Sequence, residues 1–521
     1  MAATRLSRSL LLPALSAAVL ACAAPPLSFI PVAFVGLVPL FVWIDRPLPA
    51  REMVRGAAAF GIPYILSQGW SIYSLARFTP IGALIATGAV LMLVSTWLVF
   101  PIVLNLLQHT RPLPLPLVAP LLWVVTEHAR SFGDLAIPYI MLGHFLAPSP
   151  RLIQTADLVG VYGLSAWIVA VNALIAWGLC RWRNPRLLRI AVAALAGALA
   201  FPLGYGAVRW NAIDRQIAAA PKVPVAVIQP NVAQELKWDP GAIPGVFERV
   251  NRLIARAEEG SPRLVVGPES CLPVFSNAAA TRLPDTVLPG RAPLLLGIIA
   301  GIGEGVERNW KGGRITVYER HHNSAFLADA ERRILGRYDK RALVPMGERI
   351  PFGAVLRPLA LMIEGRFGEF EPGRDDQLLD IPGPGPAARA GMLICYEAVF
   401  PRLVAATRAD GADFLINITN DAWFGRTSFA WLFAQVCALR AVENRCAVVR
   451  AANTGVSVFY DPLGRAFDAT PVGQEAVIRG EVPLLRGATF YDRAGDLVVW
   501  LSYAGTVALL LVAWVAHRRK T

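Results

Sequence analysis

The stretch Gly391-Met392-Leu393-Ile394-Cys395-Tyr396-Glu397 predicts how the C-terminal half of the chain folds. The apolar run from Met392 to Ile394 is typical of a buried strand, and it ends on a cysteine, a tyrosine and a glutamate. Rigid backbone at the end of a core strand can aim a thiol at a substrate. Cysteine is the strongest side-chain nucleophile near neutral pH once its proton is removed. The alternative is that Cys395 only packs in the core as a small apolar residue. Motifs elsewhere in the chain are needed to choose between a nucleophile and a packing residue.

The composition indicates a membrane protein. The chain has 521 residues, 55% of them hydrophobic, and a mean hydropathy of +0.48. Its net charge is +13, and within the apolar N-terminal part of the chain the basic residues fall largely in short loops between apolar spans. This is the positive-inside pattern of membrane proteins, so we reject nucleic acid as a partner. The six cysteines show no CxxC spacing and predict neither a metal site nor a clear disulfide framework.

Residues 1–208 are predicted to form an N-terminal membrane domain of about seven helices, since a span needs about 20 apolar residues. Candidate spans lie near residues 9–25, 28–45, 54–75, 82–108, 114–129, 158–180 and 187–207. The basic residues favour alternate loops, which predicts that those loops are cytoplasmic. An odd number of spans then places the following segment on the periplasmic face of a bacterial inner membrane. Glu127 and His128 are expected at the end of the short fifth span.

Residues 220–486 show the alternating strands and helices of a layered α/β domain. Strands are expected at 223–228, 263–266, 294–300, 324–328, 392–394, 414–418, 447–450 and 456–460. Residues 494–517 hold one closing apolar span with a basic tail, which predicts that both termini are cytoplasmic. The apolar segment 351–363 is interpreted either as a membrane-dipping arm or as an ordinary amphipathic surface helix.

Two charged residues elsewhere in the α/β domain could serve Cys395. Glu269 follows a strand that runs out at a proline, and it could act as general base toward the thiol. Lys340 lies in what we interpret as a mixed-charge turn, and it could stabilise the oxyanion formed when a thiol attacks an acyl carbon. Charged loop residues are more often solvated surface groups, and spacing alone does not bring the three together.

The motifs around these residues resemble those of the nitrilase (carbon–nitrogen hydrolase) superfamily. The similar stretches are Pro268-Glu269-Ser270, Tyr338-Asp339-Lys340, Val344-Pro345-Met346-Gly347-Glu348 and Ile394-Cys395-Tyr396-Glu397. Three more stretches, together with the flanking spans, resemble the apolipoprotein N-acyltransferase family. They are Asn420-Asp421-Ala422-Trp423-Phe424-Gly425, Arg440-Ala441-Val442-Glu443-Asn444-Arg445 and Arg450-Ala451-Ala452-Asn453-Thr454-Gly455-Val456-Ser457. The resemblance covers nearly the whole chain.

The resemblance implies an α/β fold plus transmembrane α-helices, with a nitrilase-like αββα sandwich inserted between the seventh and eighth helices of a membrane bundle. It implies a triad of Glu269 as base, Lys340 as oxyanion stabiliser and Cys395 as nucleophile. Glu348 would position Lys340 or the acceptor amine. Tyr396 and Glu397 would shape the pocket next to the thiol, and Trp238 would line the acyl or lipid entrance. Asn323 would be a structural or site-lining polar residue, and Trp423 a further substrate-binding or supporting residue.

The activity that the resemblance implies is a ping-pong acyl transfer. A fatty acyl chain would pass from a phospholipid, typically phosphatidylethanolamine, through a thioester on Cys395 to the α-amine of a diacylglyceryl-cysteine lipoprotein. No metal or soluble cofactor would be needed, and we expect a monomer. Two alternatives stay open: a membrane-tethered amidase or nitrilase-type hydrolase, and a membrane scaffold with an inert nitrilase-like domain. The chain departs from the family pattern at four positions, which bear on substrate preference: Gly267, Met346, Arg349 and Phe433.

Overall fold

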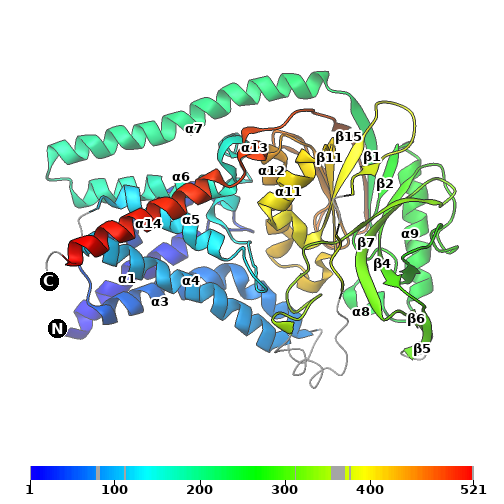
Figure 1. Ribbon diagram of the computed structural model, residues 1–521, viewed down its shortest axis with the longest axis horizontal. Helices are drawn as coiled ribbons and strands as arrows, with labels where there is room; N and C mark the ends of the chain where they lie inside the picture. Colours follow the sequence, from blue (N-terminus) through cyan, green and yellow to red (C-terminus); the bar gives the residue numbers. More distant parts are fainter. Residues whose placement is uncertain are drawn as a thin grey trace. The chain divides into compact units, whose positions relative to one another are not determined.

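The computed structural model describes residues 2–77, 82–110, 113–310, 313–353, 370–374 and 377–518 (Figure 1). The chain divides into two compact units. The first contains Met1–Phe132, Ile137–Asn211 and Ala494–Thr521, and the second contains Gly133–Ala136 and Ala212–Arg493. The arm expected at 351–363 lies outside the described residues from position 354 onward.

The first unit is built from apolar helices. They are α1 (Ala2–Ala21), α2 (Val38–Ile44), α3 (Ala50–Gly69), α4 (Gly82–Thr110), α5 (Leu115–Ala129), α6 (Ala156–Cys180), α7 (Pro185–Ala219) and α14 (Leu497–Arg518). Short 3-10 turns connect them, namely η1 (Ile30–Phe34), η2 (Trp70–Arg77), η3 (Leu142–Leu146) and η4 (Pro150–Leu152). Within the described residues, α4, α6, α7 and α14 are long and apolar enough to cross a membrane. That shorter helices such as α5 complete a set of eight spans stays a prediction.

The span expected over residues 28–45 is not one continuous helix. The chain forms η1, breaks, and starts again as α2, whose second residue is Pro39. Proline suits the first turn of a helix but cannot continue one from the preceding turn. Asn172 of α6 fills the break, because its Oδ1 accepts from the Leu37 amide and its Nδ2 donates to the Ala33 carbonyl, both at 2.8 Å. The freed backbone groups are thereby satisfied, as burial requires.

The second unit contains two β-sheets that pack face to face. The first sheet has the strand order β15-β1-β2-β4-β7-β8, with β3 beside β4, and the second has the order β14-β13-β12-β11-β10-β9. The strands of the first sheet are β1 (Lys222–Gln229), β2 (Leu264–Val266), β3 (Phe275–Asn277), β4 (Leu294–Ile302), β7 (Arg320–Ala328), β8 (Ile334–Asp339) and β15 (Ala476–Pro483). Those of the second are β9 (Leu379–Asp380), β10 (Arg389–Ile394), β11 (Phe414–Thr419), β12 (Val448–Ala452), β13 (Val458–Tyr460) and β14 (Ala466–Ala469). A separate hairpin pairs β5 (Val306–Trp310) with β6 (Gly313–Val317).

Helices cover the outer faces of the two sheets (Figure 1). Helix α9 (Ile243–Glu258) lies on the first sheet, and α11 (Pro401–Ala409) and α12 (Phe429–Glu443) lie on the second. Shorter helical pieces are α8 (Gln234–Lys237), α13 (Phe490–Ala494), η5 (Cys395–Val399) and η6 (Asp421–Phe424). Helix α9 buries a stripe at helical spacing against the sheet, made of Val246, Phe247, Val250, Leu253, Ile254 and Ala257. The αββα sandwich expected for this part of the chain is confirmed.

The parallel strands place several carboxyl ends along shared sheet edges. Strands β10, β11 and β12 are parallel neighbours, and so are β1, β2 and β4. Residues that directly follow such strands, including Cys395 after β10 and Glu269 after β2, therefore emerge where ligand sites form in α/β sheets.

Lys340 was expected in a turn, but the structure places it directly after a strand. Strand β8 pairs antiparallel with β7, and the Lys340 amide donates to the Asn323 carbonyl at 2.9 Å. The strand lies at the sheet edge, where Gly336, Arg337 and Asp339 are tolerated although they mask the strand pattern in the sequence.

Candidate active site

Cys395 stands at the end of β10 in a strained backbone conformation. Its φ of +51° lies in the left-handed region, which non-glycine residues rarely adopt outside functional or tightly held positions. The Asn417 side chain stabilises this turn. Its Nδ2 donates to the Leu393 carbonyl at 3.1 Å and to the Cys395 carbonyl at 3.4 Å. The sharp turn carries the half-buried thiol out of the line of the strand.

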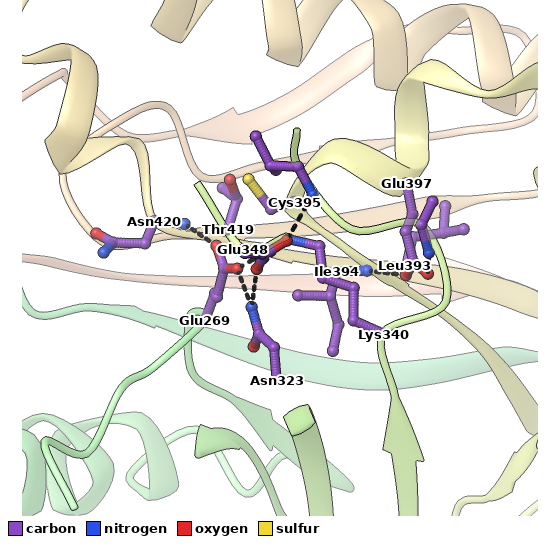
Figure 2. A network of polar contacts seen from close by, with 12 residues as sticks. Glu269, Asn323, Lys340, Glu348, Leu393, Ile394, Cys395, Glu397, Thr419 and Asn420 are labelled. Atoms are coloured by element: carbon purple, nitrogen blue, oxygen red, sulfur yellow. Dashed lines mark hydrogen bonds and ion pairs between the residues drawn. The ribbon is translucent and has the colours of Figure 1, made fainter. Parts of the chain in front are cut away.

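Four polar side chains gather beside this thiol (Figure 2). Lys340 Nζ lies 2.8 Å from Glu348 Oε1 and 3.4 Å from Glu269 Oε1. The Asn323 amide joins the two carboxylates, since its Nδ2 donates to Glu269 Oε1 at 2.6 Å and to Glu348 Oε1 at 2.7 Å. Lys340 is 1% exposed and Glu269 is 6% exposed, so the cluster is shielded from water. The structure thus brings together Glu269, Lys340, Glu348, Asn323 and Cys395, which come from separate segments of the chain.

Glu269 is held in place by backbone groups from two other segments. The Asn420 amide, directly after β11, donates to Glu269 Oε2 at 2.8 Å. The turn that carries Glu269 rests on Gly297 of β4, where a Cβ atom would lie 2.5 Å from the Pro268 carbonyl oxygen and 2.6 Å from the Glu269 Cα. Glycine is therefore required at position 297 for this close approach of two backbones.

The charges in the cluster set the resting protonation state. Burial raises the pKa of Glu269, but Lys340, Asn323 and the Asn420 amide outweigh this effect and hold that pKa below its ordinary value. Burial lowers the pKa of Lys340, but Glu348 and Glu269 outweigh it and raise that pKa above its ordinary range. Burial and the Glu269 carboxylate raise the pKa of the Cys395 thiol. The resting site therefore holds a thiol, a carboxylate and an ammonium, so Glu269 is suited to take the thiol proton during attack.

Glu397 connects the nucleophile turn to the segment around Lys340. Its carboxylate accepts from the Ile394 amide at 2.7 Å and from the Arg341 amide at 2.7 Å. It also accepts from the Tyr338 hydroxyl at 2.9 and 3.0 Å and from the Ala342 amide at 3.1 Å. We expected Glu397 to shape the pocket beside the thiol, but its bonds tie two backbone segments together. Burial raises the pKa of Glu397, while these donors oppose the rise.

The three aromatic candidates, Tyr396, Trp238 and Trp423, have the following surroundings. The Tyr396 hydroxyl donates to the Ala136 carbonyl, and its ring packs edge-on against Phe400 with centroids 5.1 Å apart. Trp238 follows α8 and its ring lies 5.5 Å from that of Phe275. Trp423 lies on η6 and is 39% exposed.

A second layer of polar residues, to which we had assigned no role, lies behind Cys395. The Thr419 hydroxyl donates to Asp421 Oδ1 at 3.0 Å, and its proximity to Cys395 opposes the rise in the pKa of the thiol. Asp421 forms a buried ion pair with Arg450, whose Nη2 lies 2.9 Å from Asp421 Oδ2. The Asn420-Asp421 and Arg450 motifs were the available signal in the sequence, but only the fold shows that Asp421 and Arg450 lie behind Cys395 and Thr419.

Lys237 is a further buried cation that we had not singled out. It is 1% exposed, and its Nζ donates to the Glu269 carbonyl oxygen at 3.3 Å. Burial lowers the pKa of Lys237 to about 8, although Cys271 and Glu269 oppose this shift. In the described ranges, no group of three His, Cys, Asp or Glu side chains is arranged to hold a metal ion.

The four departures from the family pattern have distinct surroundings. At Gly267 a Cβ atom would lie 2.6 Å from the Leu296 side chain, so the local packing admits no larger residue without a shift. Met346 has a φ of +62°, and Phe433 packs against Phe429 with ring centroids 5.4 Å apart. Arg349 pairs with Asp134 at 3.1 Å.

Sequence comparisons agree with this architecture. Residues 224–489 match the Carbon-nitrogen hydrolase family, and residues 16–174 match the Apolipoprotein N-acyltransferase N-terminal domain. The apolipoprotein N-acyltransferase of Geobacter metallireducens is 34% identical over 99% of this chain and 96% of its own length. That of Gloeobacter violaceus is 31% identical over 96% of this chain and 92% of its own. A solved structure of a mutant Nesterenkonia amidase from the nitrilase superfamily covers 51% of this chain and 92% of its own, at 20% identity and a TM-score of 0.36.

The sandwich fold and the matched profile define a protein of the carbon–nitrogen hydrolase class that carries an additional helical unit. The N-terminal match and the relatives that span almost the full chain narrow this class. The chain belongs to the apolipoprotein N-acyltransferase family, and as a member it is an acyltransferase with a carbon–nitrogen hydrolase domain.

Proposed function

We propose that this protein moves a fatty acyl chain from a phospholipid to the free α-amine of a diacylglyceryl-cysteine lipoprotein. The observation that carries the proposal is the shielded group of Glu269, Lys340 and Glu348 beside the strained Cys395 turn. This arrangement suits a thioester mechanism, since it offers a nucleophile, a base and a fixed positive charge. The family of the chain and its long apolar helices support lipid substrates.

In the first step, Cys395 attacks the ester carbonyl of the phospholipid. Glu269 takes the thiol proton as the bond between sulfur and the acyl carbon forms, and Lys340 stabilises the oxyanion. The tetrahedral intermediate then breaks its bond to the glycerol oxygen. Glu269 returns the proton to that oxygen, so a lysophospholipid leaves and a thioester remains on Cys395.

In the second step, the neutral α-amine of the lipoprotein attacks the thioester. Glu269 takes a proton from the attacking nitrogen, the bond from carbon to sulfur breaks, and the sulfur regains a proton. The products are an amide and the free thiol. Because the enzyme has to hold the thioester between two binding events, water must be kept away, and the burial of Glu269 and Lys340 favours this.

The remaining residues support these steps from fixed positions. Glu348 and Asn323 hold the Lys340 ammonium and the Glu269 carboxylate, and Glu397 fixes the nucleophile turn. We assign Trp238 to the entrance of the acyl chain, Tyr396 to the wall beside the thiol, and Trp423 to a supporting role in substrate binding. We further propose phosphatidylethanolamine as donor, a monomeric enzyme in the inner membrane, a periplasmic catalytic domain and cytoplasmic termini.

Intact mass spectrometry of the detergent-purified protein tests this proposal. Incubation with phosphatidylethanolamine should add one fatty acyl mass to wild type and to Cys180→Ala, but none to Cys395→Ala. Addition of a diacylglyceryl-cysteine peptide should move that mass to the peptide amine. Loss of the adduct to water without the peptide would favour a hydrolase. Equal behaviour of wild type and Cys395→Ala would favour a scaffold with an inert domain.

A further inference from the structure

Four residues from the N-terminal half of the sequence belong to the catalytic unit. Gly133–Ala136, here called the strap, cluster with residues 212–493 rather than with the helices that flank them in the sequence. Gly133 has a φ of +72°, a conformation that glycine adopts without a steric cost. The Ala136 amide closes the turn by donating to the Gly133 carbonyl at 3.2 Å.

Asp134 in the strap accepts three hydrogen bonds from one loop. Arg349 Nη1 donates to Asp134 Oδ1, and Arg349 Nη2 donates to the Asp134 carbonyl oxygen, both at 3.1 Å. The Phe352 amide donates to Asp134 Oδ2 at 2.8 Å. One residue thus holds the loop at two points that are three positions apart.

The loop that Asp134 holds is the one that carries Glu348. Two non-glycine residues in this loop adopt the left-handed region, Met346 with a φ of +62° and Phe352 with a φ of +50°. Such conformations cost free energy and persist only where the surroundings hold them. Glu348 lies between these two residues and contacts Lys340 at 2.8 Å, so the shape of the loop decides where the Lys340 ammonium lies.

The far end of the strap reaches the nucleophile turn. The Ala136 carbonyl accepts a hydrogen bond from the hydroxyl of Tyr396, which directly follows Cys395. The strap therefore connects the segment that positions Lys340 with the segment that carries the thiol.

The ion pair alone would not support a functional role. The Arg349 and Asp134 side chains are 36% and 40% exposed, and exposed ion pairs contribute little stability. What distinguishes Asp134 is that three donors converge on it, and one of them is the backbone amide of strained Phe352, four positions after Glu348. Such an arrangement fixes a position rather than adding much to global stability.

We propose that Asp134 is a positioning residue that keeps the 345–352 loop closed around Glu348, so that Glu348 aims Lys340 at the acyl carbonyl. This inference rests on the proposed acyl transfer. Asp134 acts through Glu348 and does not touch the reacting atoms.

Hydrogen exchange of the full-length protein in detergent tests the structural half of this proposal without any substrate. In Asp134→Ala, amides within residues 341–353 should exchange about tenfold faster than in wild type, because the loop opens locally. Arg333→Ala is the matched control. It removes an ion pair, Arg333 Nε to Asp329 Oδ2 at 2.8 Å, that lies outside the loop, and it should leave this exchange unchanged. Equal exchange in Asp134→Ala and wild type would overturn the proposal.

A double-mutant cycle with Glu348 tests the functional half. Asp134→Ala should lower the single-turnover rate of Cys395 acylation about tenfold in the wild-type background but less than about twofold in Glu348→Gln, since coupled residues are non-additive. An equal loss in both backgrounds would indicate general destabilisation and overturn the positioning role. Absence of any adduct in wild type would instead refute the proposed function. The hydrogen-exchange result would then still show whether Asp134 holds the 345–352 loop in place.

Discussion

Two buried lysines contact Glu269, but the pKa of one is raised and the pKa of the other is lowered. Lys340 lies within 3.4 Å of two carboxylates, which outweigh its burial and raise its pKa. Lys237 contacts the backbone carbonyl of Glu269 instead, and burial lowers its pKa from 10.5 to about 8. The same residue type therefore serves as a permanent cation in one position and as a titrating group in the other.

The lowered pKa of Lys237 predicts a stability change in alkaline solution. Between about pH 8 and pH 10.5 the unfolded chain binds a proton that folded Lys237 has released, so stability rises with pH in this window. Relative to Lys237→Met, wild type should gain up to about 3 kcal/mol of unfolding free energy between pH 7.5 and pH 10.5. Unfolding of both proteins in detergent across this range measures the difference. Lys222→Met, an exposed lysine at the start of β1, is the control.

Parallel stability curves for wild type and Lys237→Met would contradict this prediction. They would mean that Lys237 keeps its proton in the folded protein throughout the range. In that case the carboxylate of Glu269 and the thiol of Cys271 would stabilise the ammonium more than burial penalises it.

At the scale of elements, β4 and the turn after β2 approach so closely at Gly297 that no side chain fits between their backbones. Gly297→Ala would place a Cβ atom 2.5 Å from the Pro268 carbonyl oxygen and 2.6 Å from the Glu269 Cα. Both are backbone atoms, so the turn must move and carry Glu269 with it. We expect the Cys395 acylation rate to fall by about 100-fold, because a misplacement of about 1 Å costs this much in catalysis.

Gly245→Ala on α9 is the matched control for this substitution. A Cβ atom at Gly245 meets open space, so alanine should leave the acylation rate unchanged and slightly stabilise the helix. Single-turnover acylation and Tm measured on both variants separate the two effects. An acylation rate near wild type in Gly297→Ala would show that the base tolerates a displaced turn.

Elements with a strong apolar pattern could be predicted from the sequence, and elements with mixed patterns could not. Strand β10 was predicted because Met392–Ile394 are continuously apolar. The structure confirms the strand and shows these three residues fully buried. Strand β8 was missed because its edge position tolerates Gly336, Arg337 and Asp339. The interpretation of the Lys340 segment as a turn was wrong for the same reason.

The three proposed triad residues could be located by motif, but the residues that hold them in place make contacts across long sequence separations. Glu397 binds the Arg341 amide 56 positions away, and Arg349 binds Asp134 at a separation of 215 residues. Sequence spacing carries no signal for such pairs. The close approach of Gly297 to the Glu269 turn is likewise a property of the folded sheet alone.

At the scale of the whole molecule, the charge pattern of the helical unit predicts which face of the membrane each segment occupies. The loop between α6 and α7 carries Arg181 and Arg183, and the start of α7 carries Arg186 and Arg189. Such basic segments stay in the cytoplasm. The next segment, α7, is long and apolar enough to cross the membrane. If it does so, the catalytic unit that follows lies on the periplasmic face.

Thiol labelling with a membrane-impermeant maleimide in spheroplasts tests this topology. Cys180 is exposed at the end of α6 and should react only after the membrane is permeabilised. A cysteine introduced by Glu259→Cys, at an exposed position after α9 in the catalytic unit, should react in intact spheroplasts. Peptide mass spectrometry reads each site separately, so the native cysteines do not interfere. Labelling of Cys180 but not of the new thiol in intact spheroplasts would invert the topology, and with it the side of the membrane on which the lipoprotein amine has to be presented.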